Sequence, residues 1–115
     1  MVLNNLAYLA LEDNKLKQAE EMAKRAVALR PENAETKDTL AQIYIAKGQN
    51  EAALKLYDEI FVRPVSNDEV YLNHVELLLE MDKKPLAQRR LSSREFASQV
   101  SKDRVEALKT KYGVN

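Results

Sequence analysis

The fold is decided by residues 34–67, which read AETKDTLAQIYIAKGQNEAALKLYDEIFVRPVSN, because the same pattern of residue types occurs once before this stretch and once after it. The corresponding positions are Leu6-Ala7, Leu40-Ala41 and His74-Val75, then Ala19, Ala53 and Ala87, then Ala23, Tyr57 and Leu91. A fixed period of this size, about 34 residues, is typical of repeat arrays, in which each unit buries its apolar face only against its neighbours. The period therefore predicts a repeat architecture, and with it a function in binding another macromolecule.

The composition favours helices and excludes several kinds of protein. The 115 residues include only 2 Gly, 3 Pro and 6% aromatic residues. Ala, Leu, Lys and Glu, which lose little freedom in a helix, are abundant. The 18 basic and 18 acidic residues cancel, so no global field attracts nucleic acid. Cysteine is absent, which excludes disulfides and thiolate metal sites.

No membrane-spanning segment is indicated by the sequence. The longest apolar stretches, such as Leu77-Leu78-Leu79, are far shorter than a membrane span, and no charged and then apolar leader precedes the first repeat. We therefore expect a soluble domain, either cytoplasmic or periplasmic, without direct membrane insertion and without a nucleic-acid partner.

Each repeat is predicted to form a hairpin of two helices. Gly48 stands at the turn of the second repeat, where it can adopt the left-handed conformation that closes a helix, and Asn14 and Asp82 occupy the same position in the other repeats. Pro31 and Pro64 end the first two hairpins. The predicted boundaries are a single domain over residues 1–115, repeats at 2–33, 34–67 and 68–96, the last of them divergent, and a capping helix at 97–112.

These residues resemble the tetratricopeptide repeat family. The matching residues are Leu3, Leu6, Ala7, Ala19, Ala26 and Pro31, then Leu40, Ala41, Tyr44, Gly48, Ala53 and Tyr57, then Tyr71, Leu78, Ala87 and Leu91. The small residues in this pattern allow two helices to approach closely. The resemblance implies an all-α fold, a right-handed superhelix of antiparallel hairpins, and a non-catalytic role in binding proteins.

The sequence departs from the family pattern near its last repeat. Arg94 stands where a small residue normally packs against the next hairpin, so we expect that no ordinary hairpin follows. Residues 94–111 instead have the pattern of one amphipathic helix that caps the array, and Gly113 can close it. The side chains expected to face inward are Phe96, Val100, Val105, Leu108 and Tyr112.

The first helix is predicted to begin at Val2 without a capping residue. Its apolar residues Leu3, Leu6 and Leu9 would then lack a preceding neighbour. Two interpretations are open at this point. The chain is the C-terminal part of a longer array, or it uses this apolar face to self-associate as a homodimer through the N-terminal repeat.

No catalytic machinery is predicted. His74, the only histidine, falls on a core-facing repeat position and is interpreted as a buried, hydrogen-bonded residue rather than a ligand or a base. Ser92-Ser93 is interpreted as part of a helix junction rather than as a nucleophile. Two glycines cannot form a phosphate-binding loop. We therefore expect no enzyme activity, no cofactor and no metal.

The resemblance also implies a binding surface, because the family usually holds its partners on the concave face lined by the first helix of each hairpin. The positions carried over are Asn4, Asn5, Tyr8, Leu11 and Glu12, then Glu35, Asp38, Thr39, Gln42 and Ile45, then Glu69, Leu72, Asn73, Glu76, Leu79 and Glu80. This set is acidic with apolar patches and contains no Lys or Arg. It predicts a protein or peptide partner that is basic or mixed apolar, and it disfavours the acidic peptides that chaperone-binding members of the family hold. The alternative is that these carboxylates only solvate an exposed face.

The biological setting is predicted from a weaker resemblance. Residues 4–8 and 37–41 are similar to the closing repeats of bacterial tetratricopeptide repeat proteins, some of which belong to envelope and exopolysaccharide assembly systems. The resemblance implies a scaffold within a larger assembly. The alternatives are self-association through the first helix, or an accessory segment of a larger enzyme.

Overall fold

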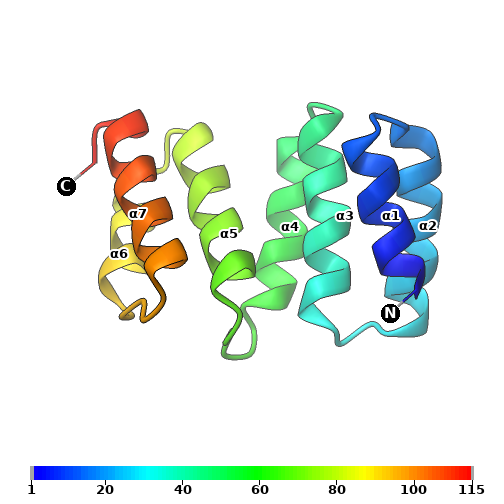
Figure 1. Cartoon of the computed structure of the whole chain (residues 1–115), viewed down its shortest axis with the longest axis horizontal. Coiled ribbons are helices and arrows are strands. Elements are labelled where there is room, and N and C mark those ends of the chain that lie inside the picture. Colours follow the sequence, from blue (N-terminus) through cyan, green and yellow to red (C-terminus); the bar gives the residue numbers. More distant parts are fainter. Residues whose placement is uncertain (1, 115) are drawn as a thin grey trace. The chain divides into compact units, whose positions relative to one another are not determined.

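A computed structural model describes residues 2–114, and the first and last residues of the predicted domain, 1 and 115, lie outside the described residues. Residues 2–114 form seven α-helices and no strands (Figure 1). The helices are α1 (Val2–Glu12), α2 (Leu16–Leu29), α3 (Ala34–Ala46), α4 (Asn50–Ile60), α5 (Asp68–Glu80), α6 (Lys84–Ser92) and α7 (Gln99–Tyr112). The predicted fold class, an all-α array of antiparallel helical hairpins, is confirmed. None of these helices is long and apolar enough to cross a lipid bilayer.

The chain divides into two compact units, which meet in the sequence between Pro64 and Val65. The first unit contains the hairpins α1–α2 and α3–α4, and α2 also packs against α3 while α1 contacts α3. The second unit contains α5, α6 and α7, and α5 contacts both of the others.

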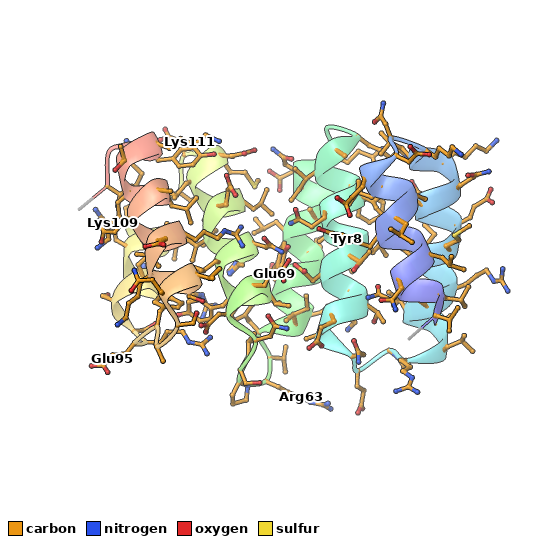
Figure 2. The ribbon with its side chains drawn as sticks, viewed as in Figure 1. Tyr8, Arg63, Glu69, Glu95, Lys109 and Lys111 are labelled. Carbon is orange, nitrogen blue, oxygen red and sulfur yellow. The ribbon has the colours of Figure 1, made fainter. Side chains whose placement is uncertain are left out.

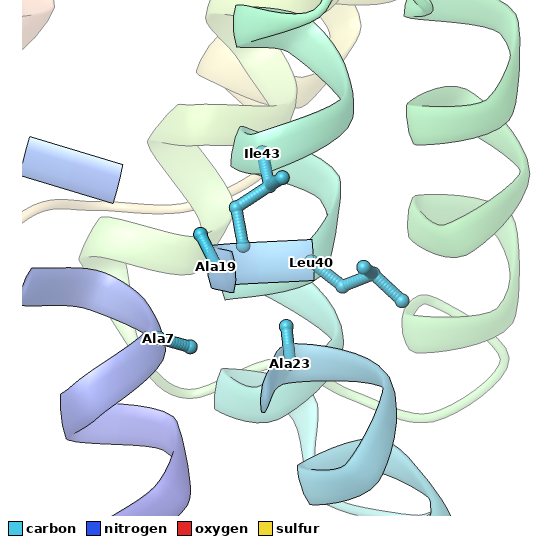
Figure 3. Close-up of a cluster of buried hydrophobic side chains, with 5 residues drawn as sticks. All are labelled: Ala7, Ala19, Ala23, Leu40 and Ile43. Atoms are coloured by element: carbon cyan, nitrogen blue, oxygen red, sulfur yellow. The ribbon is translucent and has the colours of Figure 1, made fainter. Parts of the chain in front are cut away.

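The core of the first unit is built where small residues let helices approach. Ala7, Ala19 and Ala23 have no exposed surface, and they form one cluster with Leu40 and Ile43 of α3 (Figure 3). Because alanine places only one methyl group between two backbones, α2 can pack closely on both α1 and α3. This close approach of helices is what the period of small residues in the sequence predicts.

The three hairpin turns share one backbone geometry. Asn14, Gly48 and Asp82 all have positive φ angles, of 58°, 77° and 58°. The next residue in each turn donates its N–H to a carbonyl five residues back, at 2.8 Å in all three cases: Lys15 to Ala10, Gln49 to Tyr44 and Lys83 to Leu78. The left-handed position predicted from the repeat register is therefore confirmed in all three hairpins.

The first helices of the later repeats share an N-terminal cap. The side chains of Asn33, Asn67 and Ser98 each accept a hydrogen bond from a backbone N–H in the first turn that follows. Asn33 and Asn67 are separated by one full period, whereas Ser98 follows Asn67 three positions too early for the next one. The helix α7 is thus a fourth helix of the same kind, displaced from the register of the first three.

This shift corrects the predicted capping helix. The helix begins at Gln99, not at Arg94 or residue 97, because Ser98 caps it. Val100 was expected to face inward but is 81% exposed, since the buried stripe is Ser101, Val105 and Leu108 and Val100 lies about 100° around the helix from Ser101. Gly113 has φ +65° and closes the helix, as predicted.

Arg94 lies in the segment between α6 and α7 and holds the segment that precedes α5. Its guanidinium donates to the carbonyls of Val65 and Ser66, at 2.9 and 3.0 Å, and pairs with Asp68 at 3.2 Å. It also lies 4.5 Å from the centre of the Tyr71 ring. The cation that departs from the family pattern therefore replaces apolar packing with a set of charged and cation–π contacts.

Ser93 lies at the C-terminal cap of α6, next to Tyr71. Its hydroxyl is 2.8 Å from the Tyr71 hydroxyl, which also donates to the carbonyl of Arg90 at 2.5 Å. The interpretation of Ser92-Ser93 as part of a helix junction is confirmed.

Candidate functional site

The first unit brings ten of the candidate residues together on the neighbouring helices α1 and α3. Four are exposed, four are half-buried and two are buried. The exposed residues are Asn5, Tyr8, Glu12 and Glu35, the half-buried ones are Asn4, Leu11, Gln42 and Ile45, and the buried ones are Asp38 and Thr39. Tyr8 of α1 is the largest exposed side chain of the set, with 44% of its surface accessible, and its label in Figure 2 lies beside α3.

Asp38 belongs to a buried hydrogen-bonded chain rather than to an open surface. The Tyr57 hydroxyl of α4 donates to the Asp38 carboxylate at 2.5 Å, and the Gln42 amide donates to the Tyr57 hydroxyl at 2.9 Å. Thr39 is also buried and donates to the carbonyl of Glu35 at 3.0 Å. The placement of Asp38 and Thr39 on an accessible face is therefore corrected, because the second helix of their own hairpin supplies a hydroxyl that draws Asp38 inward.

Asn4 occupies the same repeat position as Asp38 but has no such donor. The residue that corresponds to Tyr57 in the first hairpin is Ala23, which carries no hydroxyl. The side-chain oxygen of Asn4 is buried and makes no hydrogen bond within residues 2–114. Burial of an amide oxygen without a donor costs about 1–3 kcal/mol, and native structures contain few such groups. Asn4 is thus an acceptor, on the predicted binding face, that the fold itself leaves unused.

The charge on this face is acidic because its cations are engaged elsewhere. Residues 2–12 include no Lys or Arg. Lys37 of α3 pairs with Glu59 of α4 at 3.0 Å, and Lys47, after α3, pairs with Glu20 of α2. Hydrogen bonds from Lys24 and Lys47 hold the pKa of Glu20 below its usual value. Glu12 and Glu35 remain as the exposed charges of the face.

The second unit does not present its six candidate residues in the same way. Leu72 and Leu79 are 1% and 4% exposed, because both α6 and α7 pack on α5. The placement of these two leucines on an accessible face is corrected. Glu69 is exposed at the first turn of α5 (Figure 2).

The other three candidates of the second unit are bonded to α7. Arg104 donates to Asn73 at 2.7 Å and to Glu76 at 3.3 Å, and Lys111 pairs with Glu76 at 3.6 Å. Tyr112 donates to Glu80 at 3.1 Å. The capping helix thus supplies the basic groups that a partner was expected to supply, together with a tyrosine hydroxyl. Apart from Glu69, the open part of the predicted surface is the one on α1 and α3.

His74 lies in the core of the second unit, as predicted, with only 4% of its surface exposed. Burial, with a further contribution from the charge of Arg90, lowers its pKa to about 4. The imidazole is therefore neutral at pH 7 and has no access to a substrate. Within residues 2–114, no three His, Asp or Glu side chains are gathered as metal ligands would be.

A second surface lies on the outer face of α1. Val2, Leu6 and Leu9 are 73%, 44% and 60% exposed and lie one above another at spacings of four and three residues. The sequence indicated an apolar face here but assigned Leu3 to it, whereas Leu3 is half-buried and Val2 takes its place. The repeat register contains the correct assignment, because the residues that correspond to Val2, Leu6 and Leu9 in the second hairpin are Thr36, Leu40 and Ile43, all of which are buried.

Comparison with known proteins identifies the repeat. Residues 10–61, from the end of α1 to the end of α4, match the model of a tetratricopeptide repeat family. No curated protein gives a significant match to the chain. The matched segment contains the turn at Asn14, the alanines of α2 and the whole of the second hairpin, and the same positions recur in α5 and α6. By this match, residues 10–61 are tetratricopeptide repeats, and the remaining helices continue the same array of hairpins.

Proposed function

We propose that the protein binds a peptide segment of a partner protein on the face formed by α1 and α3. Tetratricopeptide repeats generally mediate protein–protein interaction, which sets the class of function. The observation that carries the proposal is the buried, unbonded side-chain oxygen of Asn4, one helical turn from the exposed ring of Tyr8. Rotation of the half-buried Asn4 side chain would turn this oxygen toward a donor of a bound peptide, while apolar side chains of the peptide cover Tyr8.

The chemistry of the face indicates the kind of peptide. Glu12 and Glu35 are exposed, and the nearby cations Lys37 and Lys47 are paired with carboxylates of α4 and α2. Opposite charge raises the rate of association and sets orientation, while the buried contacts supply most of the affinity. The expected peptide therefore carries Lys or Arg together with apolar residues, and it makes backbone or side-chain N–H donors available to Asn4.

The test is a selection from a library of displayed peptides on the immobilised protein, run in parallel on an Asn4→Leu variant. Leucine fits this position, because Leu72 occupies it in the third repeat. The variant should be more stable, by about 1 kcal/mol, because a buried unbonded oxygen is removed. Peptides selected on the original protein should bind the variant at least tenfold more weakly. Gain of stability with loss of binding is the signature of a functional group.

The matched controls are Tyr8→Ala and Val100→Ala. Tyr8→Ala should weaken the selected peptides by a similar factor, whereas Val100, an exposed residue of α7, should be replaceable without effect. Peptides that bind Asn4→Leu and Tyr8→Ala as well as they bind the original protein would exclude the face of α1 and α3 as the binding site.

The second candidate function is association through the outer face of α1, and the observation that favours it is the exposed stripe of Val2, Leu6 and Leu9. A homodimer would be one form of this association. Sedimentation across a range of concentrations tests it, because Leu6→Glu should dissociate any dimer formed in this way.

The setting in bacterial envelope or exopolysaccharide assembly, and the role as an accessory segment of a larger enzyme, stay predictions of the sequence.

A further inference from the structure

The helix α6, drawn in yellow in Figure 1, differs from the second helices of the other two hairpins in the charges of its surface. The exposed residues of those helices have both signs, with Lys17 and Glu21 on α2 and Lys55 and Asp58 on α4. Residues 83–94, which contain α6, include no Asp or Glu. The cations of this segment are Lys83, Lys84, Arg89, Arg90 and Arg94. Among the three second helices, α6 is therefore the one whose charged residues are all positive.

The repeat register places a serine of α6 where α4 carries a carboxylate. Ser92 follows Asp58 by one full period, and Arg89 follows Lys55 by the same period. Asp58 and Ser92 are both exposed, and each lies three residues after its cation, a spacing at which opposite charges attract on a helix. The second repeat thus shows that this exposed position accepts a negative charge. An anion on Ser92 would give α6 the mixed charges that α4 already has.

The hydroxyl of Ser92 is more accessible to chemistry than that of its neighbour Ser93. Ser92 is the last residue of α6, and its hydroxyl donates to the carbonyl of Arg89 at 3.2 Å, within the same turn. The hydroxyl of Ser93 is instead held against α5, because it lies 2.8 Å from the Tyr71 hydroxyl and donates to the carbonyl of Arg90 at 3.1 Å. Of the two serines, Ser92 is the one that can react without breaking a contact between helices.

The end of α6 can also be opened at small cost, which matters because an enzyme that modifies a serine must bind the residues on either side of it. At 9 residues α6 is the shortest of the seven helices, and Ala87 is its one buried residue. Residues 93–98, which follow it, form no regular structure. Unwinding the last turn breaks mainly the hydrogen bonds of Tyr71 and Ser93 to the carbonyl of Arg90. Segments with so few buried contacts open locally while the rest of a protein stays folded.

We propose that Ser92 is a phosphorylation site, modified by a serine kinase that recognises arginines two and three residues before the acceptor. Arg90 and Arg89 occupy these two positions, and kinases select their substrates by such patterns of charge. In the transfer, the Ser92 hydroxyl gives its proton to the catalytic aspartate of the kinase, and its oxygen forms a bond to the γ-phosphorus of ATP. The bond from that phosphorus to the β,γ-bridging oxygen breaks, and ADP leaves.

The phosphate changes the charge of one surface and leaves the fold in place. It adds about two negative charges at pH 7, which offset those of Lys84, Arg89 and Arg90 on α6. An anion at the C-terminal end of a helix is unfavourable by itself, but Arg89 lies one turn before Ser92 and compensates it. The site is separate from the peptide-binding face proposed for α1 and α3, because Ser92 belongs to the second unit.

The test is phosphorylation of the whole chain by the catalytic subunit of the cyclic-AMP-dependent protein kinase, which has this specificity, with ATP and Mg²⁺. We expect one phosphate on each chain, assigned to Ser92 by tandem mass spectrometry and absent from Ser92→Ala. Arg89→Gln should lower the rate about tenfold, because a charge that the kinase recognises is lost. The matched control is Lys84→Gln, which removes an equal charge from the other end of α6 and should leave the rate unchanged.

A peptide of residues 86–97 serves as the reference for access. A phosphorylated peptide beside an unmodified chain would overturn the proposal, since the fold would then close the site. So would a chain and a peptide that both stay unmodified, or a phosphate on Ser93 instead. Ser92→Asp tests whether the fold accepts the charge, and the midpoint of its thermal unfolding should stay within about 2 °C of the original. A larger fall would mean that the position does not accept an anion as Asp58 does.

Discussion

The two hairpins of the first unit have the same register, but their equivalent residues have different surroundings. Leu40 on α3 is buried against α2, whereas Leu6 on α1 is 44% exposed. Asp38 accepts a hydrogen bond from Tyr57, whereas the Asn4 oxygen in the same position makes none. The second hairpin is thus completed by its neighbours, and the first contains the groups that the fold leaves open. In a repeat array the neighbour, not the residue type, decides whether a position contributes to stability or is available for binding.

The largest expected loss of stability comes from truncating Leu40, and its repeat equivalent Leu6 provides the comparison. Leu40→Ala should lower the free energy of unfolding by about 2–5 kcal/mol, because it leaves a cavity beside Ala19 and Ala23. Leu6→Ala should cost about 1 kcal/mol or less, because water already reaches much of that side chain. Urea unfolding followed by circular dichroism measures both variants.

Leu56→Ala is a control of intermediate burial, since Leu56 packs at the margin of the same cluster. Its loss of unfolding free energy should lie between those of Leu6→Ala and Leu40→Ala. Equal losses for Leu6→Ala and Leu40→Ala would mean that the outer face of α1 is covered in solution, and the contrast between the hairpins would be lost.

His74 occupies the position of Leu6 and Leu40 in the third repeat, and it makes stability depend on pH. Burial lowers its pKa to about 4, from 6.5 in the unfolded chain. Below pH 6.5 the unfolded state therefore binds a proton at this histidine, whereas the folded state binds it only below about pH 4. The associated stability is complete above pH 6.5 and is lost between pH 6.5 and 4, by about 3 kcal/mol in total.

His74→Leu should remove this dependence, because leucine fills the same position in the other repeats. The free energy of unfolding, measured at intervals from pH 7.5 to 4, should fall less steeply in the variant. Part of the slope below pH 5 should remain in both proteins, because ion-paired carboxylates such as Glu20 have lowered pKa values. Parallel curves for the two proteins between pH 6.5 and 5 would contradict the assignment.

Much of this fold could be predicted from the sequence because its determinants are local or strictly periodic. The alanines of the period must lie where helices approach, and a turn residue at Asn14, Gly48 or Asp82 must adopt the left-handed backbone conformation whatever surrounds it. The three-residue shift before α7 was missed because it breaks the period. The signal that could have located the helix is the capping residue Ser98, which caps α7 as Asn33 and Asn67 cap α3 and α5.

The binding face was predicted less well because its residues depend on partners in other helices. Asp38 was placed on an open surface, but the hydroxyl that draws it inward belongs to Tyr57 on the next helix. The repeat register alone contains this information, since it pairs Asn4 with Ala23 and Asp38 with Tyr57. The bonds from α7 to Glu76 could not be found in this way, because α7 does not follow the period.

A smaller loss of stability is expected from removing the Tyr57 hydroxyl, which donates to Asp38 in the second hairpin. The equivalent Asn4 of the first hairpin has no such donor. Tyr57→Phe should cost about 2 kcal/mol, because the Asp38 carboxylate and the Gln42 amide both lose the hydroxyl between them. The ring itself is retained, so little packing changes. Asn4→Leu, which should raise stability, is the opposite change at the equivalent position. A Tyr57→Phe variant as stable as the original protein would show that Asp38 finds another donor.

The smallest effect tests whether the three turns are as alike in energy as they are in geometry. A methyl group added at Gly48 would meet no atom within 4 Å, so Gly48→Ala probes only the cost of the left-handed backbone conformation, about 1 kcal/mol. Asn14→Gly and Asp82→Gly should instead raise stability, by a few tenths of a kcal/mol. Asn14 and Asp82 already adopt the left-handed conformation with φ +58°, and glycine adopts it without strain. Thermal unfolding measures all three. Stabilisation by Gly48→Ala would mean that the reduced freedom of the unfolded chain outweighs the strain in the folded turn. The two hairpins would then differ in the energy of their turns as well as in the helices that surround them.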